Sequence, residues 1–142
     1  MADSDQIYAE VLTPEGPVYE GRLYQLSART AIGEVGVRSR HAPLLARLVP
    51  NELRLYETRE EFNAQSGRNY AAAEGWLEVF ANRVVVLVGE AHAPESLDAA
   101  ALKERIADAE QRLAEAEQGS ASYEVAESDL QRAQAFLALA ER

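Results

Sequence analysis

The hydrophobic pattern of this chain changes its period near Pro94, and this change constrains the fold more than any other feature. Before Pro94, apolar and polar residues alternate in short runs, as from Ile7 to Leu12, and glycine and proline separate the runs. A period of two is typical of β-strands with one buried face. After Pro94, apolar residues recur every three or four positions, which is the period of an amphipathic helix. The sequence therefore predicts a segregated α+β fold, with a β-domain at residues 1–94 and helices at residues 95–142.

The first part reads as many short strands joined by turns. The cluster Thr13 to Pro17 predicts a turn, and the alternation around Leu53 and Leu55 predicts a strand with one solvated face. A further strand is expected at Trp76 to Phe80, with the single tryptophan packed in the core. The run Arg83 to Val88 reads as a strand that is buried on both faces. Short strands at regular spacing favour an all-β sandwich or barrel for this domain.

The last part reads as two helices in an antiparallel hairpin. Ser96 is the expected N-cap of the first helix, with Asp98 in its first turn, and Gly119 is the expected stop. Ser120 or Ser122 can cap the second helix, and so short a link places the helices antiparallel. The two apolar stripes are Leu102, Ile106, Ala109, Leu113 and Ala116, and Tyr123, Ala126, Leu130, Ala133, Leu137 and Ala140.

Those stripes alternate large and small residues, as in Leu113 then Ala116 and Leu130 then Ala133. Apolar burial contributes roughly 25 cal/mol per Å², so alanine in the seam adds little stability. We expect the hairpin to be marginal alone and to rely on the β-domain or on another protein. A detachable arm is therefore a reasonable interpretation.

Composition excludes several classes of function. The formal net charge is −10 over 142 residues, which argues against nucleic-acid binding and against adhesion to an anionic membrane. There is no cysteine, so disulfides, thiolate zinc sites and cysteine nucleophiles are excluded. The segment MADSDQIYAE lacks the features of a signal peptide, and the apolar run Val84 to Val88 is too short to cross a bilayer. We expect a soluble, cytosolic protein that reaches a membrane only through a protein partner.

Catalytic motifs are missing from the sequence. There is no Walker motif, no GxGxxG and no GxSxG elbow, and the two histidines lack the HExxH spacing. Sequence alone leaves a Ser-His-Asp set open. We interpret His92 as a linker residue, while His41 is a turn residue, a surface residue or a ligand. Four arginines form either a local basic patch or scattered solubilising charge: Arg38, Arg40, Arg47 and Arg54.

The order of several segments resembles the ε-subunit family of the F-type ATP synthases. The segments are Val11 to Gly21, Gly33 to Val37, His41 to Leu45, Pro50 to Leu55, Glu74 to Ala91 and the alanine-rich hairpin. The resemblance implies a flattened β-sandwich followed by two helices. It implies a non-catalytic rotor subunit that joins the γ subunit to the ring of c subunits. In such a subunit the hairpin can also contact the α and β subunits. It also implies a peripheral position at the cytoplasmic face of a bacterial inner membrane.

The resemblance also assigns docking residues. The turn that faces the polar loops of the c ring corresponds to Gly33, Glu34, Val35 and Gly36, and His41 lies near the γ and c contacts. Glycine lets the backbone approach closely, and an exposed Glu34 can meet basic residues of a partner. The family usually has Pro-Gly where this chain has Ser39 and Arg40, so Arg40 adds a charge beside the proposed interface.

Two family behaviours are weakened in this chain. Some members bind ATP on the hairpin, but here only Asp98 and Arg132 of that motif are kept, while Ala101 and Phe136 stand where arginines are expected. Each charge-assisted contact is worth about 1.5–3 kcal/mol, so we predict weak or absent ATP binding and no cofactor. The second helix is also more acidic than basic, so inhibition of ATP hydrolysis would be steric. A nucleotide sensor and an adaptor outside the synthase remain as alternatives, and an enzyme is the weakest reading.

Overall fold

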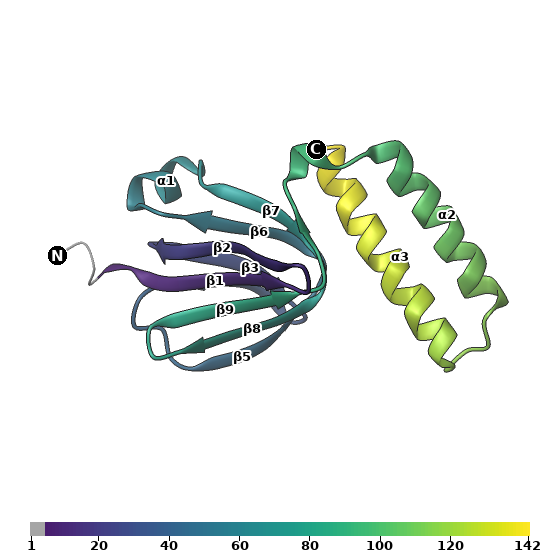
Figure 1. Cartoon of the computed structure of the whole chain (residues 1–142), viewed down its shortest axis with the longest axis horizontal. Coiled ribbons are helices and arrows are strands. Elements are labelled where there is room, and N and C mark those ends of the chain that lie inside the picture. Colours follow the sequence, from purple (N-terminus) through teal and green to yellow (C-terminus); the bar gives the residue numbers. More distant parts are fainter. Residues whose placement is uncertain (1–4) are drawn as a thin grey trace. The chain divides into compact units, whose positions relative to one another are not determined.

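The computed structural model describes residues 5–142 and forms two compact units, Met1–His92 and Ala93–Arg142. The first unit contains a ten-stranded sheet and the short helix α1 (Arg59–Ala64) (Figure 1). The strands are β1 (Ile7–Thr13), β2 (Gly16–Leu23), β3 (Gln25–Thr30), β4 (Gly33–Val37), β5 (Leu44–Leu48), β6 (Asn51–Tyr56), β7 (Arg68–Ala72), β8 (Gly75–Phe80), β9 (Arg83–Val88) and β10 (Ala91–His92).

The strand order is β10-β7-β6-β3-β5-β8-β9-β1-β2, and β4 pairs with β3 beside this path. Neighbouring strands run antiparallel except for the parallel pair β1 and β9. One apolar core fills the inside of the sheet. Its largest fully buried side chains include Ile7, Leu26, Leu55, Leu77 and Val86. The predicted β-sandwich followed by two helices is confirmed, because alternate residues of each strand supply this core.

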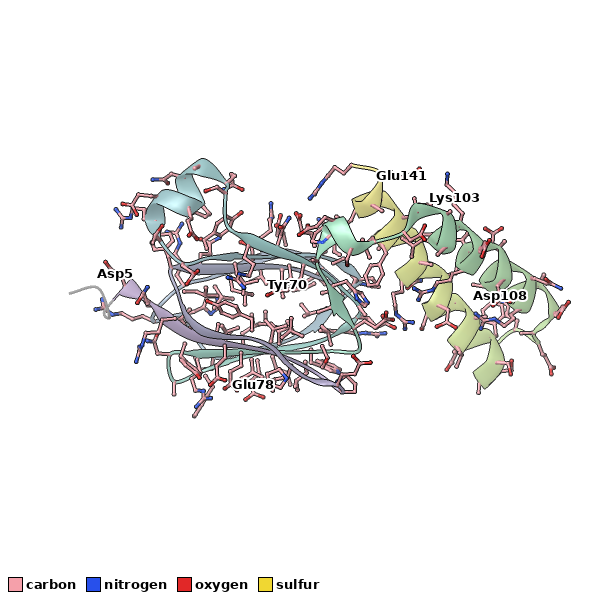
Figure 2. The ribbon with its side chains drawn as sticks, turned by 45° about the horizontal axis from the view of Figure 1, so that its top comes forward. Asp5, Tyr70, Glu78, Lys103, Asp108 and Glu141 are labelled. Carbon is pink, nitrogen blue, oxygen red and sulfur yellow. The ribbon has the colours of Figure 1, made fainter. Side chains whose placement is uncertain are left out.

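The outer face of β8 and β9 contradicts two expectations. Trp76 is 49% exposed, and Leu87 on β9 is 50% exposed, so neither lies in the core. The two residues stand opposite each other in the antiparallel β8–β9 pair and therefore share the outer face. β9 is thus buried on one face only. Figure 2 shows the neighbouring outward residue Glu78 on the outside of the sandwich, with Tyr70 within it.

His92 also differs from its interpretation as a linker residue. It forms the short strand β10 with Ala91, and β10 pairs antiparallel with β7, with His92 opposite Ala71. Its Nε2 lies 2.9 Å from Oε1 of Glu90. The sheet therefore continues to the end of the first unit.

The second unit is a pair of helices, α2 (Ala99–Glu115) and α3 (Ala121–Ala140), preceded by the 3-10 turn η2 (Pro94–Ser96). Asp98 is the N-cap of α2, because its Oδ1 accepts hydrogen bonds from the backbone N–H groups of Ala100 and Ala101. The expected cap at Ser96 is wrong, since that residue belongs to η2. Ser120 caps α3 as predicted, with Oγ accepting from the N–H of Tyr123.

The buried seam of the hairpin follows the predicted stripes in part. Leu102 and Ala109 of α2 are buried, as are Ala126 and Ala133 of α3. Phe136, which the stripes left out, is fully buried and is the largest buried side chain of this unit. Within residues 5–142, no helix is long and apolar enough to cross a membrane.

Candidate docking surface

The first group of predicted docking residues, Gly33 to Gly36, forms most of strand β4, so the expectation that they form a turn is wrong. The turn itself lies just before them, at residues 31–32. Gly33 has a φ of 137°, which residues with a side chain rarely adopt. Thr30 closes the turn: its Oγ1 donates to the carbonyl oxygen of Gly33 at 2.6 Å and accepts from the N–H of Ile32 at 3.3 Å. Ile32 at the tip is fully exposed. The local hydrogen bonds thus fix a turn that presents an apolar side chain to solvent.

The second glycine of this segment has a different role. Gly36 lies in β4 opposite Ser27 of β3. A Cβ atom at Gly36 would come within 2.8 Å of Nε2 of Gln25, whose side chain is buried. Val35, between the glycine and Glu34, packs against the core. Glu34 and Gly36 are the exposed residues of this strand, and of the two only Glu34 carries a side chain.

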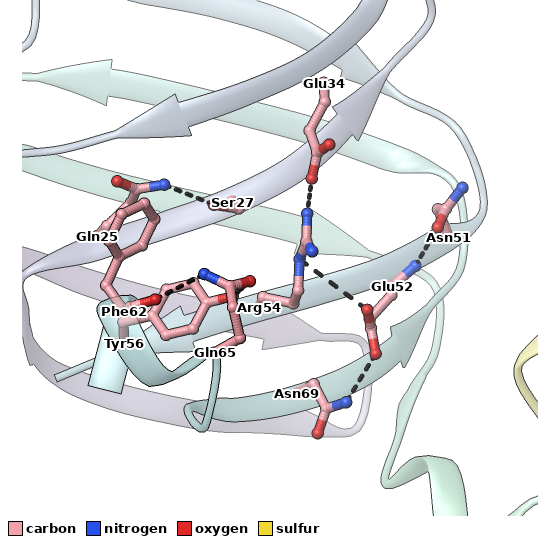
Figure 3. Close-up of polar contacts among 10 residues, drawn as sticks. All are labelled: Gln25, Ser27, Glu34, Asn51, Glu52, Arg54, Tyr56, Phe62, Gln65 and Asn69. Carbon is pink, nitrogen blue, oxygen red and sulfur yellow. Dashed lines mark hydrogen bonds and ion pairs between the residues drawn. The ribbon is translucent and has the colours of Figure 1, made fainter. Parts of the chain in front are cut away.

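Glu34 is not a free carboxylate. Its side chain is about half exposed, and it forms an ion pair with the guanidinium of Arg54 on β6 (Figure 3). Nε of Arg54 lies 3.9 Å from Oε1 of Glu52, and Oε2 of Glu52 accepts a hydrogen bond from Asn69 at 2.6 Å. We expected the carboxylate of Glu34 to be available for basic residues of a partner. This expectation is corrected, because Arg54 already balances the charge of Glu34. A basic partner would compete with Arg54 for this carboxylate.

A groove lies beside the β3–β4 turn. Its volume is about 470 Å³, and it runs between the turn and β5. Ile32 and Leu45 supply exposed apolar surface along it, with Leu45 66% exposed. Glu34 and Arg47 place one charge of each sign in its lining. The groove suits a partner loop with mixed polar and apolar character.

Arg40 and His41 lie in the loop at residues 38–43, which follows β4. Arg40 has a positive φ of 63°, and its N–H donates to Oδ1 of Asn82 at 3.0 Å. The N–H of His41 donates to the carbonyl oxygen of Arg38 at 3.3 Å. This loop leaves the far end of β4, and four residue steps along a strand span roughly 13 Å. The structure therefore places Gly33 and Glu34 at the turn end of β4 and Arg40 and His41 beyond its other end, with Val35 and Gly36 between them.

The outer face of β5, β8 and β9 is a surface that sequence reasoning missed. Its exposed side chains include Leu45, Trp76, Phe80 and Leu87. The segment from Trp76 to Phe80 could have indicated this surface. Trp76, Glu78 and Phe80 stand at alternate positions of the strand, so all three point to the same face. A charged residue rarely faces a core, so Glu78 marks this face as the solvent face of the strand.

The two residues predicted as remnants of a nucleotide site have structural partners. The carboxylate of Asp98 caps α2. Arg132 donates from Nη1 to Oδ1 of Asp129 at 3.1 Å, and only a fifth of its side chain is exposed. Phe136, at the place of an expected arginine, is buried in the hairpin. Among residues 5–142, no group of three or more His, Asp or Glu side chains is arranged to hold a metal ion.

Comparison with known proteins agrees with this architecture. The family model "ATP synthase, Delta/Epsilon chain, beta-sandwich domain" matches residues 6–94. The ATP synthase epsilon chain of Halalkalibacterium halodurans is 34% identical over 137 residues, which cover 96% of this chain and 98% of the relative. The ATP synthase epsilon chain of a Sulfurihydrogenibium species is 30% identical and is covered to 94%.

Solved structures share the fold. A chain of the Euglena gracilis mitochondrial ATP synthase matches with a TM-score of 0.75 at 19% identity, covering 94% of this chain and 81% of that one. A chain of the Tetrahymena thermophila mitochondrial ATP synthase matches with a TM-score of 0.57 at 18% identity. The family match over most of the β-unit and the full-length bacterial relatives confirm the resemblance seen in the sequence. The chain therefore belongs to the family of ATP synthase epsilon chains, which are non-catalytic accessory subunits of that complex.

Proposed function

We propose that this chain is a central-stalk subunit that joins the γ subunit to the c-subunit ring of a proton-translocating F-type ATP synthase. The observation that carries the proposal is the outer face of β5, β8 and β9, where Trp76 and Leu87 lie side by side and half exposed. Burying a large apolar side chain contributes about 1.5–3 kcal/mol, so such a face is stabilised by a protein partner. We assign this face to the γ subunit.

The separation of the two groups of predicted docking residues supports a joining role. The β3–β4 turn, with the exposed Ile32 and the adjacent Gly33 and Glu34, lies at one end of β4, and Arg40 and His41 lie beyond the other end. We assign the β3–β4 turn, with Ile32 at its tip, to the c ring, and Arg40 and His41 to the γ side. A hydrogen-bonded sheet between two contact sites holds them apart at a fixed separation, which a joining subunit needs. Attachment at the cytoplasmic face of a bacterial inner membrane then comes through the complex.

The hairpin is proposed to modulate ATP hydrolysis by steric contact with the α and β subunits. Its basic residues offer little free charge, since Arg112 and Arg132 are paired with aspartates. ATP is expected to bind weakly or not at all, because Asp98 serves as a helix cap and Ala101 and Phe136 replace guanidinium donors. These features favour a stalk subunit over a nucleotide sensor.

The proposal is tested by titrating the purified γ subunit with this chain in a calorimeter. We expect wild type to bind, and Trp76→Ser together with Leu87→Ser to weaken binding at least tenfold, about 1.4 kcal/mol. The matched control is Val125→Ser, which removes a side chain of similar exposure (56%) from the hairpin. Because Trp76 is the only tryptophan, its fluorescence should shift to the blue on binding. Absence of wild-type binding at micromolar concentrations would favour an adaptor outside the synthase.

A further inference from the structure

Arg38 is the first residue after β4 and begins the loop at residues 38–43. Its guanidinium carbon lies 4.7 Å from the ring centroid of Tyr24 and 5.0 Å from that of Phe62. Its Nε donates a hydrogen bond to Oε1 of Gln25 at 2.7 Å. The Gln25 side chain is buried, and its Nε2 donates to Oγ of Ser27 at 2.8 Å. Two rings and one buried amide thus hold a single guanidinium at the base of the loop.

The rings come from elements that are themselves fixed. Phe62 lies on α1 and meets the ring of Tyr56 edge-on, with centroids 5.3 Å apart. Tyr56 ends β6, is almost fully buried, and donates from its hydroxyl to Oε1 of Gln65 at 2.9 Å (Figure 3). Thr58 caps the start of α1 by accepting from the N–H of Glu61. Phe62 and Gln65 therefore anchor α1 to Tyr56 of the sheet, and Phe62 reaches Arg38 from that anchor.

The loop beyond Arg38 has few other anchors. The N–H of His41 bonds back to the carbonyl oxygen of Arg38, and the N–H of Arg40 bonds to Asn82. Asn82 is in turn held by its Nδ2, which donates to the carbonyl oxygen of Gln6 at 3.0 Å. The position of Arg40 and His41 therefore depends on two points, the side chain of Arg38 at the start of the loop and Asn82 beside its middle.

We propose that α1 positions the docking loop, residues 38–43, through Arg38. The rings of Tyr24 and Phe62 adjoin each other, with centroids 5.9 Å apart and planes tilted by 52°, and we call the contact of Arg38 with this pair of rings the clamp. Arg38 is then a positioning residue: it orients Arg40 and His41 and does not itself bind the partner. The role of the loop in docking rests on the proposed function, but the clamp is a property of the free chain. A planar guanidinium can pack against the adjoining rings and donate a hydrogen bond from Nε at the same time, whereas an ammonium has neither the plane nor that donor. Charge alone at residue 38 is therefore insufficient for the clamp.

Hydrogen exchange of the full-length free chain, followed by mass spectrometry over residues 38–45, tests the clamp. We expect Arg38→Lys, which keeps the charge, and Phe62→Ala to accelerate exchange in this segment at least fivefold. Glu60→Ala is the matched control, an exposed side chain on the same helix, and should leave exchange unchanged. Arg38→Lys leaves the ring contacts of α1 with Tyr56 in place, so it separates the clamp from unfolding of α1. Wild-type exchange rates in both variants would overturn the proposal.

Titration of the γ subunit with the same variants connects the clamp to docking. Arg38→Lys should weaken binding of the γ subunit severalfold, although the net charge is unchanged. If Arg38→Lys binds γ as tightly as wild type does, the loop needs no positioning by Arg38. If wild type itself does not bind γ, the proposed function fails, while the exchange experiment still decides whether the clamp exists. The two failures are thereby distinguishable.

Discussion

Two glycines of the β-unit show how differently one residue type is constrained. A Cβ atom on Gly75, at the start of β8, would lie 1.9 Å from the carbonyl oxygen of Leu87 on the paired strand β9. At Gly89, one residue beyond β9, the same atom would meet nothing within 4 Å. The first glycine allows two strands to approach, and the second occupies open space. The sequence shows that a glycine stands between Glu74 and Trp76. Only the paired strand β9 shows why a larger residue does not fit there.

We predict that Gly75→Ala destabilises the chain by about 1–3 kcal/mol, because the added methyl group collides with backbone that cannot rotate away. Gly89→Ala should change stability by no more than about 0.5 kcal/mol. The midpoint of urea unfolding, followed by circular dichroism at a strand wavelength, measures both. Equal midpoints for the two variants would contradict the close approach of β8 and β9.

Among the helices, the hairpin combines a small-residue seam with ion pairs that cross it. Arg112 of α2 donates from Nε to Oδ2 of Asp108 at 2.9 Å, and its Nη2 lies 3.0 Å from Oδ2 of Asp129 on α3. Hydrogen bonds to Asp108 and then Asp129 raise the pKa of Arg112 above its ordinary value, because both contacts favour the charged guanidinium. Lys103 reaches Glu141 at 3.6 Å near the other end. Charge therefore supplements the weak packing that the alanine seam provides.

We predict that Arg112→Met lowers the melting temperature of the hairpin more than Lys103→Met does. Arg112 pairs with one carboxylate on each helix, Asp108 of α2 and Asp129 of α3. Lys103 makes one longer contact and is more exposed. Exposed pairs contribute about 0.2–1 kcal/mol each, so the expected shift is a few degrees. Circular dichroism at 222 nm follows the helices at low salt and at high salt. Salt screens exposed charges, so the difference in melting temperature between the two variants should shrink at high salt. A difference that stays the same would count against an ionic role for Arg112.

The helix boundaries show how far local signals reach. Both Ser96 and Asp98 are suitable caps by residue type, and the period of the stripes places the helix start only to within a few residues. Leu97 is extended in the structure, with φ −74° and ψ 137°, so α2 begins after it and Asp98 becomes the cap. Sequence predicted that the helix exists, and the backbone path out of η2 decided its first residue.

At the scale of the whole molecule, the chain divides between His92 and Ala93. Every member of the main apolar core lies in the first unit. The second unit has its own small core around Leu102, Ala109 and Phe136. Each unit therefore has an interior of its own, although that of the hairpin is much smaller.

We predict that a chain ending at His92 folds alone. Its core remains complete, so the fragment should show a strand-type circular dichroism spectrum and a cooperative melt within a few degrees of the β-unit in the full chain. The isolated hairpin, residues 93–142, should be only partly helical, because an alanine seam buries little area. A fragment of residues 1–92 that is unfolded or aggregated would show that the sandwich depends on the hairpin.

Much of this protein was determined by short-range pattern in the sequence. Alternation and helical period are imposed by backbone geometry over a few residues, so they predicted the sandwich and the hairpin. The residue type of Ser120 predicted the cap of α3. The tertiary structure decided what depends on residues far apart in the chain. Pairing with Leu87 placed Trp76 on the outer face, Arg54 reached Glu34 across the sheet, and Phe62 of α1 reached Arg38. A single strand shows which residues share a face, but only its neighbours determine which face is buried and which charges meet.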